Sequence, residues 1–388
     1  MKPKLLVTAS TFPRWAGDTE PRFILDLSKS LLPFFEVTVL APACPGAKKY
    51  EILEGIKVIR YHYFPVHNFE TLCYPGAIVP RIKEKKWRIL LVPFLFLGLW
   101  FSLFRLLPKY DIVHAHWLIP QGIVQSFFKK KYIITGHGGD VTSLNIPLIK
   151  NLKIHALKKA ERITVVSHAL EKYIVDFIGD RNIFVQPMGC DLSMFGAENR
   201  VENYFDQGDK KVVLFVGRLA EKKGVSYLIE AVKNIDVKLI IVGEGPLEKQ
   251  LKRQAESQRN KISFLGGKTH EELKKIYASA DIFVAPSITA KDGDKEGVPT
   301  TIMEAMASGL PVIASDSSGI PEVVSDGENG FLTEEKNVED IAKRITLLIE
   351  NADLYKRLKN GAINDSKDFD YNIIGEKYAN IIRECLKD

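Results

Sequence analysis

Two glutamates stand eight positions apart in the stretch AKDGDKEGVPTTIMEAMASGLPVIAS, residues 290–315, in different local settings. Glu296 precedes a Gly-Val-Pro turn, whereas Glu304 falls about one turn inside the helix that Pro299 is expected to open. A carboxylate inside such a helix can accept hydrogen bonds from two ribose hydroxyls, and one before the helix can face a sugar. The alternatives are a helix-dipole partner for Glu296 and a surface position for Glu304, although the methionines beside Glu304 disfavour the surface because an unpaired carboxylate on an apolar face is costly.

A basic loop follows the apolar run VVLFV in the stretch VVLFVGRLAEKKGVSYLIEA, residues 212–231. Arg218 and Lys223 lie between the end of a predicted strand and a helix that Gly224 opens. The free N–H groups and dipole of a helix start already favour an anion, so two cations beside it predict a phosphate site. The alternative is a solvated basic loop, which is the interpretation we give Lys222.

A similar turn follows the next strand, in IIVGEGPLEKQL, residues 240–251. Gly243 and the glycine two residues later would let a ligand approach the backbone there. The same residues also occur in ordinary turns.

Short apolar runs alternate with helical patterns along the chain, which predicts parallel sheets covered by helices on both faces. The strands expected in the first half are residues 4–8, 36–40, 56–60, 111–115, 132–135, 162–166 and 183–186. Those expected in the second half are residues 212–216, 237–242, 261–265, 281–284 and 311–314.

The series breaks at residues 191–211, a polar stretch without clear periodicity that we interpret as an interdomain linker. The sequence thus predicts two facing Rossmann-like domains, residues 1–195 and 209–367. The last segment, residues 368–388, has apolar residues spaced three and four apart, and we expect a helix that packs back on the first domain. Doubly wound sheets bind ligands at the carboxyl ends of their strands, so a cleft between such domains is the expected site.

The composition is that of a soluble globular protein, with 46% hydrophobic and 26% charged residues among 388 and a net charge of +6. The mild positive charge suits an anionic small molecule or an acidic membrane surface, and we expect no nucleic-acid partner because the basic residues form no obvious stripe. The four cysteines are scattered without metal-ligand spacing, and the N-terminus reads as a strand instead of a signal peptide. A cytoplasmic location is therefore expected.

One uncharged segment, ILLVPFLFLGLWFSLF at residues 89–104, follows a mostly basic run at residues 81–88. Expected strands of one sheet lie on both sides of it, which argues against a membrane span. A buried core helix and a helix in the membrane interface are the alternatives. Its many aromatic residues and the basic run favour contact of residues 81–104 with anionic lipid, which would place the protein peripherally at the inner face of the membrane.

Several of these stretches together resemble the retaining glycosyltransferases of the GT-B fold, sequence family four. The residue 296–315 stretch looks like that family's E-x7-E motif, VGRLAEKKG resembles its phosphate loop, and VGEGP and SGIPEVVSDGENGFL match two further elements. The first half agrees more loosely, through HAHW, TGHGGDV at residues 135–141 and PMGCD. The loop at residues 10–23 departs from the family's Gly-Gly pair, because it holds only Gly17, and resembles a subgroup that acts on polysaccharide or lipid-linked acceptors.

The resemblance implies a role for each matching residue. Glu296 and His137 would face the donor sugar, Glu304 would bind the nucleotide ribose, and Asp140 would support the loop of His137. The residues expected to bind the donor nucleotide and its diphosphate are Gly17, Arg218, Lys223, Gly243, Val298, Thr300, Thr301 and Glu304.

The implied activity is transfer of a sugar, with retention of configuration, from a UDP- or GDP-linked donor to a glycan, lipid-linked or other hydroxyl acceptor. No cofactor and no metal are expected, since the Arg–Lys pair replaces the ion, although Asp292 and Asp294 could mimic a metal motif. A nucleotide-sugar epimerase, or a non-catalytic module that binds a membrane or polysaccharide, are alternatives on the same fold.

Overall fold

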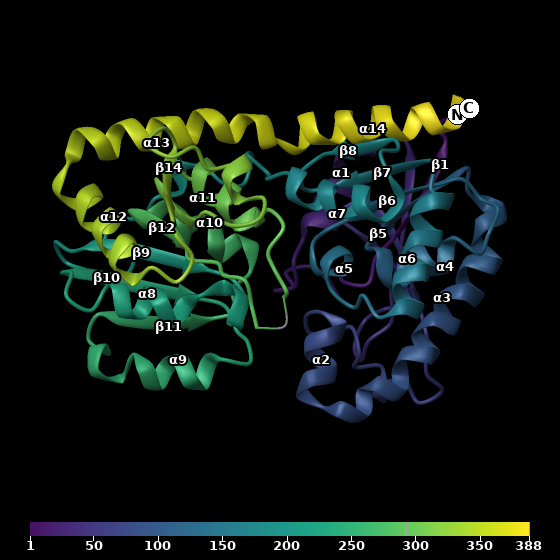
Figure 1. The fold of residues 1–388 in the computed structure, drawn as a ribbon, viewed down its shortest axis with the longest axis horizontal. Helices are drawn as coiled ribbons and strands as arrows, with labels where there is room; N and C mark the ends of the chain where they lie inside the picture. Colours follow the sequence, from purple (N-terminus) through teal and green to yellow (C-terminus); the bar gives the residue numbers. More distant parts are fainter. Residues whose placement is uncertain (292, 388) are drawn as a thin grey trace. The chain divides into compact units, whose positions relative to one another are not determined.

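The computed structural model describes residues 1–291 and 293–387, and the chain divides into two compact α/β units (Figure 1). Unit 1 comprises Met1–Pro187 and Tyr371–Asp388, and unit 2 comprises Met188–Asp370.

Unit 1 is built on an eight-stranded sheet of order β3-β4-β2-β1-β5-β6-β7-β8 within the described residues. Its strands run parallel except β3, which pairs antiparallel with β4 at the edge. The strands are β1 (Lys4–Thr8), β2 (Glu36–Pro42), β3 (Tyr50–Leu53), β4 (Ile56–Tyr61), β5 (Ile112–His116), β6 (Tyr132–Gly136), β7 (Arg162–Val165) and β8 (Ile183–Val185). The helices are α1 (Phe23–Ser30), α2 (Ile78–Glu84), α3 (Val92–Leu106), α4 (Ile123–Gln125), α5 (Gly139–Thr142), α6 (Pro147–Lys159), α7 (His168–Ile178) and α14 (Tyr371–Lys387).

Unit 2 is built on a parallel six-stranded sheet of order β11-β10-β9-β12-β13-β14 within the described residues. The strands are β9 (Lys211–Val216), β10 (Val237–Val242), β11 (Ile262–Gly266), β12 (Ile282–Ala285), β13 (Val312–Ser315) and β14 (Gly330–Thr333). The helices are α8 (Val225–Ala231), α9 (Glu248–Gln254), α10 (His270–Ser279), α11 (Thr300–Ala307), α12 (Val338–Glu350) and α13 (Ala352–Ser366).

The central strand β9 shows why these apolar runs form a covered sheet. Successive side chains of a strand point to opposite faces. Val212, Leu214 and Val216 lie in one buried cluster, whereas Val213 and Phe215 lie in another. Both faces of the sheet are therefore packed, which explains a continuous apolar run instead of an alternating one.

The division between the units differs from the expected boundary at residue 195 and from the expected linker. The chain passes into unit 2 after Pro187, because Cys190, Phe195 and Phe205 are buried in the core of unit 2. Polar composition did not prevent this segment from packing, since a few large apolar side chains anchor it.

The chain returns to unit 1 through α14, where the final helix was expected. Tyr371 donates a hydrogen bond from its hydroxyl to the carbonyl of Phe23 (3.3 Å), and the hydroxyl of Tyr378 donates to the carbonyl of Gln186 (3.1 Å). A Cβ on Gly375 would lie 2.4 Å from the hydroxyl oxygen of Ser30, so α14 packs closely against α1.

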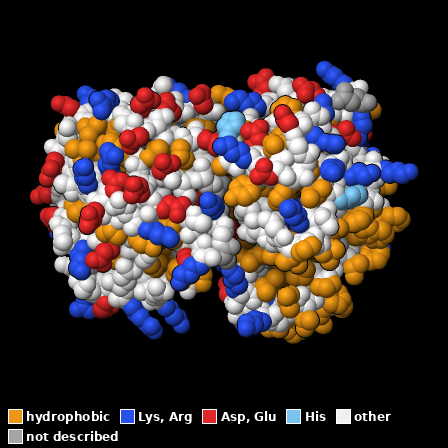
Figure 2. Space-filling view, in the orientation of Figure 1, with side chains coloured by type: hydrophobic (Ala, Val, Ile, Leu, Met, Phe, Trp, Pro, Cys, Tyr) orange, Lys and Arg blue, Asp and Glu red, His pale blue; other side chains and the backbone are white. Residues whose placement is uncertain are grey.

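Helix α3 buries only one narrow stripe, made by Leu95, Leu99 and Leu103. The helical stretch Lys86–Lys109 is apolar and long enough to span a membrane, but β1 and β5 on either side of it pair directly in one sheet. A single crossing would separate those strands, so α3 lies on the surface of unit 1. Hydrophobic side chains gather there (Figure 2), and the exposed ones are Trp87, Ile89, Leu90, Phe94, Leu97, Trp100, Phe101 and Phe104.

Candidate functional site

The glycines after β9 and β10 are required by close backbone contact. A Cβ on Gly243, which has a φ of +128°, would lie 1.9 Å from the carbonyl oxygen of Gly217. A Cβ on Gly245 would lie 2.4 Å from the carbonyl oxygen of Leu219. The two turns thus form one tight backbone layer at the carboxyl end of the sheet, where parallel α/β sheets bind ligands.

The loop after β9 is also pressed against the loop after β12. A Cβ on Gly224 would lie 1.8 Å from the carbonyl oxygen of Pro286, and the N–H of Ile288 donates to the carbonyl of Lys222 (2.8 Å). These contacts bring the basic loop to the segment that carries Glu296.

Glu296 is held by two lysines. The ammonium of Lys223 lies 3.1 Å from Glu296 Oε2, and that of Lys222 lies 3.5 Å from Oε1. Only 12% of the Glu296 side chain is exposed. Burial opposes its ionisation, but Lys222 and Lys223 outweigh burial and lower the pKa of Glu296 to about 2, so the carboxylate is charged at neutral pH.

The interpretation of Lys222 as a solvated residue is wrong. Its side chain is 28% exposed and lies 3.1 Å from Asp294 as well as beside Glu296. The two carboxylates raise the pKa of Lys222 against the effect of burial, and they hold the ammonium at this site. The two adjacent lysines of EKKG are the sequence signal that could have indicated that both contact the same carboxylate. The partner expected for Asp294 in a metal motif, Asp292, lies outside the described residues.

The backbone of Glu296 is fixed by the loop that follows the neighbouring strand, β13. The hydroxyl of Ser318 donates to the carbonyl of Glu296 (2.6 Å). The carboxylate of Glu335 accepts from the N–H and the hydroxyl of Thr289 and from the hydroxyl of Ser317. Glu335 thus ties the loop after β12 to the loop after β13, a role that its distant sequence position did not reveal.

Helix α11 begins where the sequence predicted. Pro299 precedes its first residue, Thr300, in extended backbone, and no side chain caps the helix start by a hydrogen bond. The N–H groups of Thr300 and Thr301 are in the first turn, where helices leave donors available to an anion. Val298 packs partly buried against the apolar core, which leaves its proposed backbone contact with a diphosphate a prediction.

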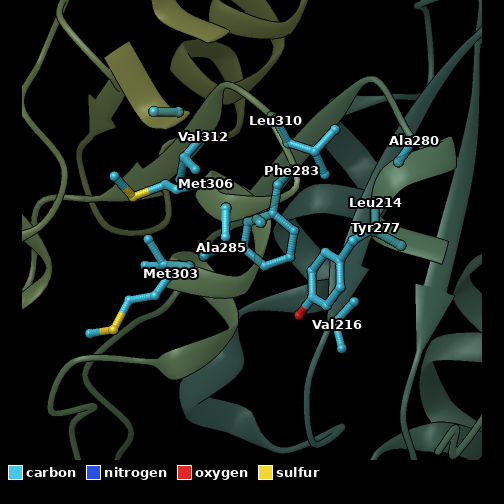
Figure 3. Packing of buried hydrophobic residues seen from close by; sticks show 14 of the residues in the cluster. Leu214, Val216, Tyr277, Ala280, Phe283, Ala285, Met303, Met306, Leu310 and Val312 are labelled. Carbon is cyan, nitrogen blue, oxygen red and sulfur yellow. The ribbon is translucent and has the colours of Figure 1, made fainter. Parts of the chain in front are cut away.

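Glu304 is buried, at 8% exposure, so a surface position is excluded. Its Oε2 accepts a hydrogen bond from the hydroxyl of Tyr277 (2.8 Å). Figure 3 shows Tyr277 among apolar side chains that include Val216 and Phe283. Tyr277 therefore orients the carboxylate, and sequence reasoning missed it because it comes from α10 instead of a recognised motif.

His137 lies in unit 1, directly after β6. Its Nε2 is 3.0 Å from Nδ1 of His116, which ends β5. Burial lowers the pKa of His137 to about 3, so its ring is neutral at pH 7. Asp140 accepts hydrogen bonds from the N–H groups of His137 and Gly138 (both 3.0 Å) and from that of Leu118 (2.9 Å), and it supports this loop as expected.

Gly17 lies in an exposed turn with a φ of +75°, and a Cβ there would meet nothing within 4 Å. The same loop is closed by Asp18, which accepts hydrogen bonds from the backbone N–H of Arg14 (2.7 Å) and from its guanidinium (2.6 and 2.9 Å). Gly17 therefore serves the turn, and its contact with a donor remains a prediction.

Two family models match most of the chain. "Glycosyltransferase Family 4" matches residues 21–194, and "Glycosyl transferases group 1" matches residues 198–365. The chain belongs to the group 1 glycosyltransferases. It is accordingly a hexosyltransferase that takes its sugar from a nucleotide sugar, and the non-catalytic alternative is set aside.

Curated relatives agree with this assignment. An uncharacterized glycosyltransferase of Methanocaldococcus jannaschii, MJ1178, is 28% identical over 82% of this chain and 88% of its own length. The GDP-mannose-dependent alpha-(1-6)-phosphatidylinositol monomannoside mannosyltransferase of Mycolicibacterium smegmatis is 26% identical over 88% of each chain.

Solved structures confirm the GT-B fold. Sucrose-phosphate synthase from Thermosynechococcus elongatus matches all of both chains with a TM-score of 0.80 at 19% identity. Anabaena HepE, solved in complex with UDP-glucose, matches 98% of this chain and 100% of its own with a TM-score of 0.74 at 20% identity.

Proposed function

We propose that this glycosyltransferase is a retaining enzyme that moves a hexose from a UDP- or GDP-linked donor to a hydroxyl of a glycan or a lipid-linked acceptor. The observation that carries the proposal is the Lys223–Glu296 pair at the carboxyl end of the unit 2 sheet. A lysine ammonium has three donors, and the hydrogen bond to Glu296 uses one. The others can bind a phosphate oxygen while the carboxylate faces the sugar.

The reaction requires charge balance at the leaving diphosphate. The bond from the anomeric carbon to the diphosphate breaks, a bond to the acceptor oxygen forms, and the acceptor proton passes to the departing diphosphate. Arg218, Lys223 and the first turn of α11 would stabilise the charge that develops there. Glu304 would bind the ribose, and His137 would contribute a neutral imidazole to the sugar.

Support for the donor class comes from the relatives. The mycobacterial relative is named as GDP-mannose-dependent, and Anabaena HepE was solved with UDP-glucose. Both donor classes therefore belong in a first screen.

The stereochemical experiment combines a thermal-shift screen of UDP- and GDP-sugars with NMR of the product. A bound donor at 100 times its dissociation constant should stabilise the protein by about 2.7 kcal/mol. An α-linked product from an α-linked donor supports retention. A β-linked product contradicts it, and isomerisation of the donor without any acceptor would indicate an epimerase.

We further propose that the enzyme works at the inner face of a membrane, with the α3 surface in the lipid interface. Phe101 and Phe104 are 53% and 62% exposed. Three lysines just before the apolar stretch, Lys83, Lys85 and Lys86, are exposed as well. Apolar side chains next to cations suit an anionic bilayer, because each nearby Lys or Arg contributes about 1 kcal/mol. The mycobacterial relative is named for a phosphatidylinositol acceptor, which supports a lipid-linked acceptor here.

A further inference from the structure

A second cluster of possible ligands lies in unit 1, in the loop that follows β4. His62, His67 and Glu70 each offer one ligand atom, and these atoms all lie within 4.8 Å of one another. The loop contains the short helix His67–Phe69, which turns the chain so that the three side chains meet.

Glu70 is the fixed member of the cluster. It is 1% exposed, and its Oε1 accepts hydrogen bonds from the N–H groups of Tyr63 (2.6 Å) and Phe64 (3.1 Å). These bonds set the plane of the carboxylate and leave Oε2 facing the two histidines. Such hydrogen bonds to a carboxylate orient it as the outer shell of a metal site does.

The two imidazoles approach that oxygen together. Nδ1 of His62 lies 2.9 Å from Glu70 Oε2, and Nδ1 of His67 lies 3.4 Å from the same atom. The rings face each other at a tilt of 33°, with centroids 3.7 Å apart. One histidine suffices to satisfy one carboxylate oxygen. An ion between the three atoms accounts for both histidines.

We propose that His62, His67 and Glu70 form a Zn²⁺ site with water as the fourth ligand. Neighbouring ligand atoms of a tetrahedral zinc lie about 3.3–3.5 Å apart for bonds of about 2.0–2.2 Å. The distance from His67 Nδ1 to Glu70 Oε2 fits this range. On binding zinc, the rings of His62 and His67, which are 36% and 57% exposed and 3.7 Å apart, would move away from each other. Two imidazoles and one carboxylate are a ligand set that zinc takes in proteins.

The ion would hold the loop beneath the surface that α3 exposes. Phe64 packs on Phe94 with ring centroids 5.1 Å apart, and Phe69 packs on Trp87 at 5.8 Å. A Cβ on Gly98 would lie 2.9 Å from Cβ of Tyr63, so α3 also rests directly on the loop. Zinc binding would therefore stabilise unit 1 and order the residues that support this surface.

The test uses the full untagged chain after removal of metal, titrated with Zn²⁺ by calorimetry and with Co²⁺ by visible absorption. We expect one ion per chain, a Co²⁺ absorption spectrum typical of four-coordinate cobalt, and a higher Tm on adding Zn²⁺. His62→Ala and His67→Ala should each weaken Zn²⁺ binding at least about tenfold and abolish the Co²⁺ spectrum. Both side chains are partly exposed, so these variants should keep the Tm of the metal-free parent.

His168→Ala is the matched control, because His168 is also bonded to a glutamate (His168 Nδ1 to Glu171 Oε2, 2.9 Å) but lies outside the cluster. It should bind Zn²⁺ as the parent does. Zn²⁺ affinity of His62→Ala and His67→Ala equal to that of the parent, or no Zn²⁺ binding by the parent, would overturn the proposal. None of these readouts depends on sugar transfer, so the site and the proposed function fail independently.

Discussion

At the scale of single residues, the proposed donor site depends on ion pairs between neighbouring side chains. Glu296 stays ionised in a mostly buried position because Lys222 and Lys223 lie beside it, and Glu304 keeps its orientation through Tyr277. The sequence indicated the two glutamates by their spacing. It could not indicate Tyr277, because a hydrogen bond between two helices depends on packing that no local pattern encodes.

The two glutamates should be separable by conservative substitution. Glu304→Gln keeps an acceptor for Tyr277 but removes the carboxylate charge that would face the ribose. We expect about tenfold weaker binding of the free nucleoside diphosphate. Glu296→Gln should leave that binding within about threefold, or strengthen it, and lower turnover about 10²-fold. Calorimetry and a diphosphate-release assay measure the two effects, with exposed Glu350→Gln as control. Identical defects in both variants would refute this division of roles.

At the scale of elements, strand and helix positions followed the apolar patterns closely. The strands that the sequence missed, β3 and β14, are four-residue strands, each at an edge of its sheet. β3 buries little apolar surface, and β14 is buried but too short to show a clear pattern. The tight layer made by the glycine turns was only suggested, since Gly-rich turns also occur without a ligand.

Gly243→Ala tests that layer. The added Cβ would overlap the carbonyl oxygen of Gly217 at 1.9 Å and would require a φ of +128°, so we expect a loss of about 1–3 kcal/mol. The Tm should fall by about 2–4 °C per kcal/mol, and donor binding should weaken. Gly267→Ala is the control, because its Cβ would meet only the end of the Glu244 side chain, at 3.3 Å. An unchanged Tm for Gly243→Ala would show that the turns are not so tightly packed.

Liposome sedimentation tests the α3 surface. We expect the parent to sediment with vesicles that contain anionic lipid, and a variant with Lys83, Lys85 and Lys86 changed to Glu to remain in the supernatant. Phe101→Ser with Phe104→Ser should also release it, because exposed apolar side chains must enter the interface.

The control changes three exposed lysines at another surface to Glu, Lys249, Lys275 and Lys343. It alters the net charge equally and should not release the protein from the vesicles. Equal recovery of the parent and the triple lysine variant in the supernatant would contradict membrane docking. So would a dimer, detected by light scattering, that buries this surface.

At the scale of the whole molecule, the sequence predicted two Rossmann-like units and a final helix that returns to the first. It placed the boundary too late, because Phe195 and Phe205 interrupt a polar stretch and anchor it in unit 2.

The intact enzyme should turn over in excess chelator, since side chains and the start of α11 supply the positive charge at the diphosphate. Removing zinc from the proposed site of His62, His67 and Glu70 should lower the Tm but leave turnover at 25 °C within about twofold. Activity and thermal stability measured on the same chelated sample separate the two effects. Loss of turnover that Mg²⁺ or Mn²⁺ restores would instead favour a metal-bound donor.

The most direct measurement of the central claim is release of nucleoside diphosphate from the donor by Arg218→Ala and Lys223→Ala, compared with the parent at saturating acceptor. We predict that each variant keeps the parent's fold by circular dichroism and loses at least about 10²-fold in turnover, because a cation is removed from a developing charge. Normal turnover by both variants would contradict the assignment of this loop as the donor diphosphate site.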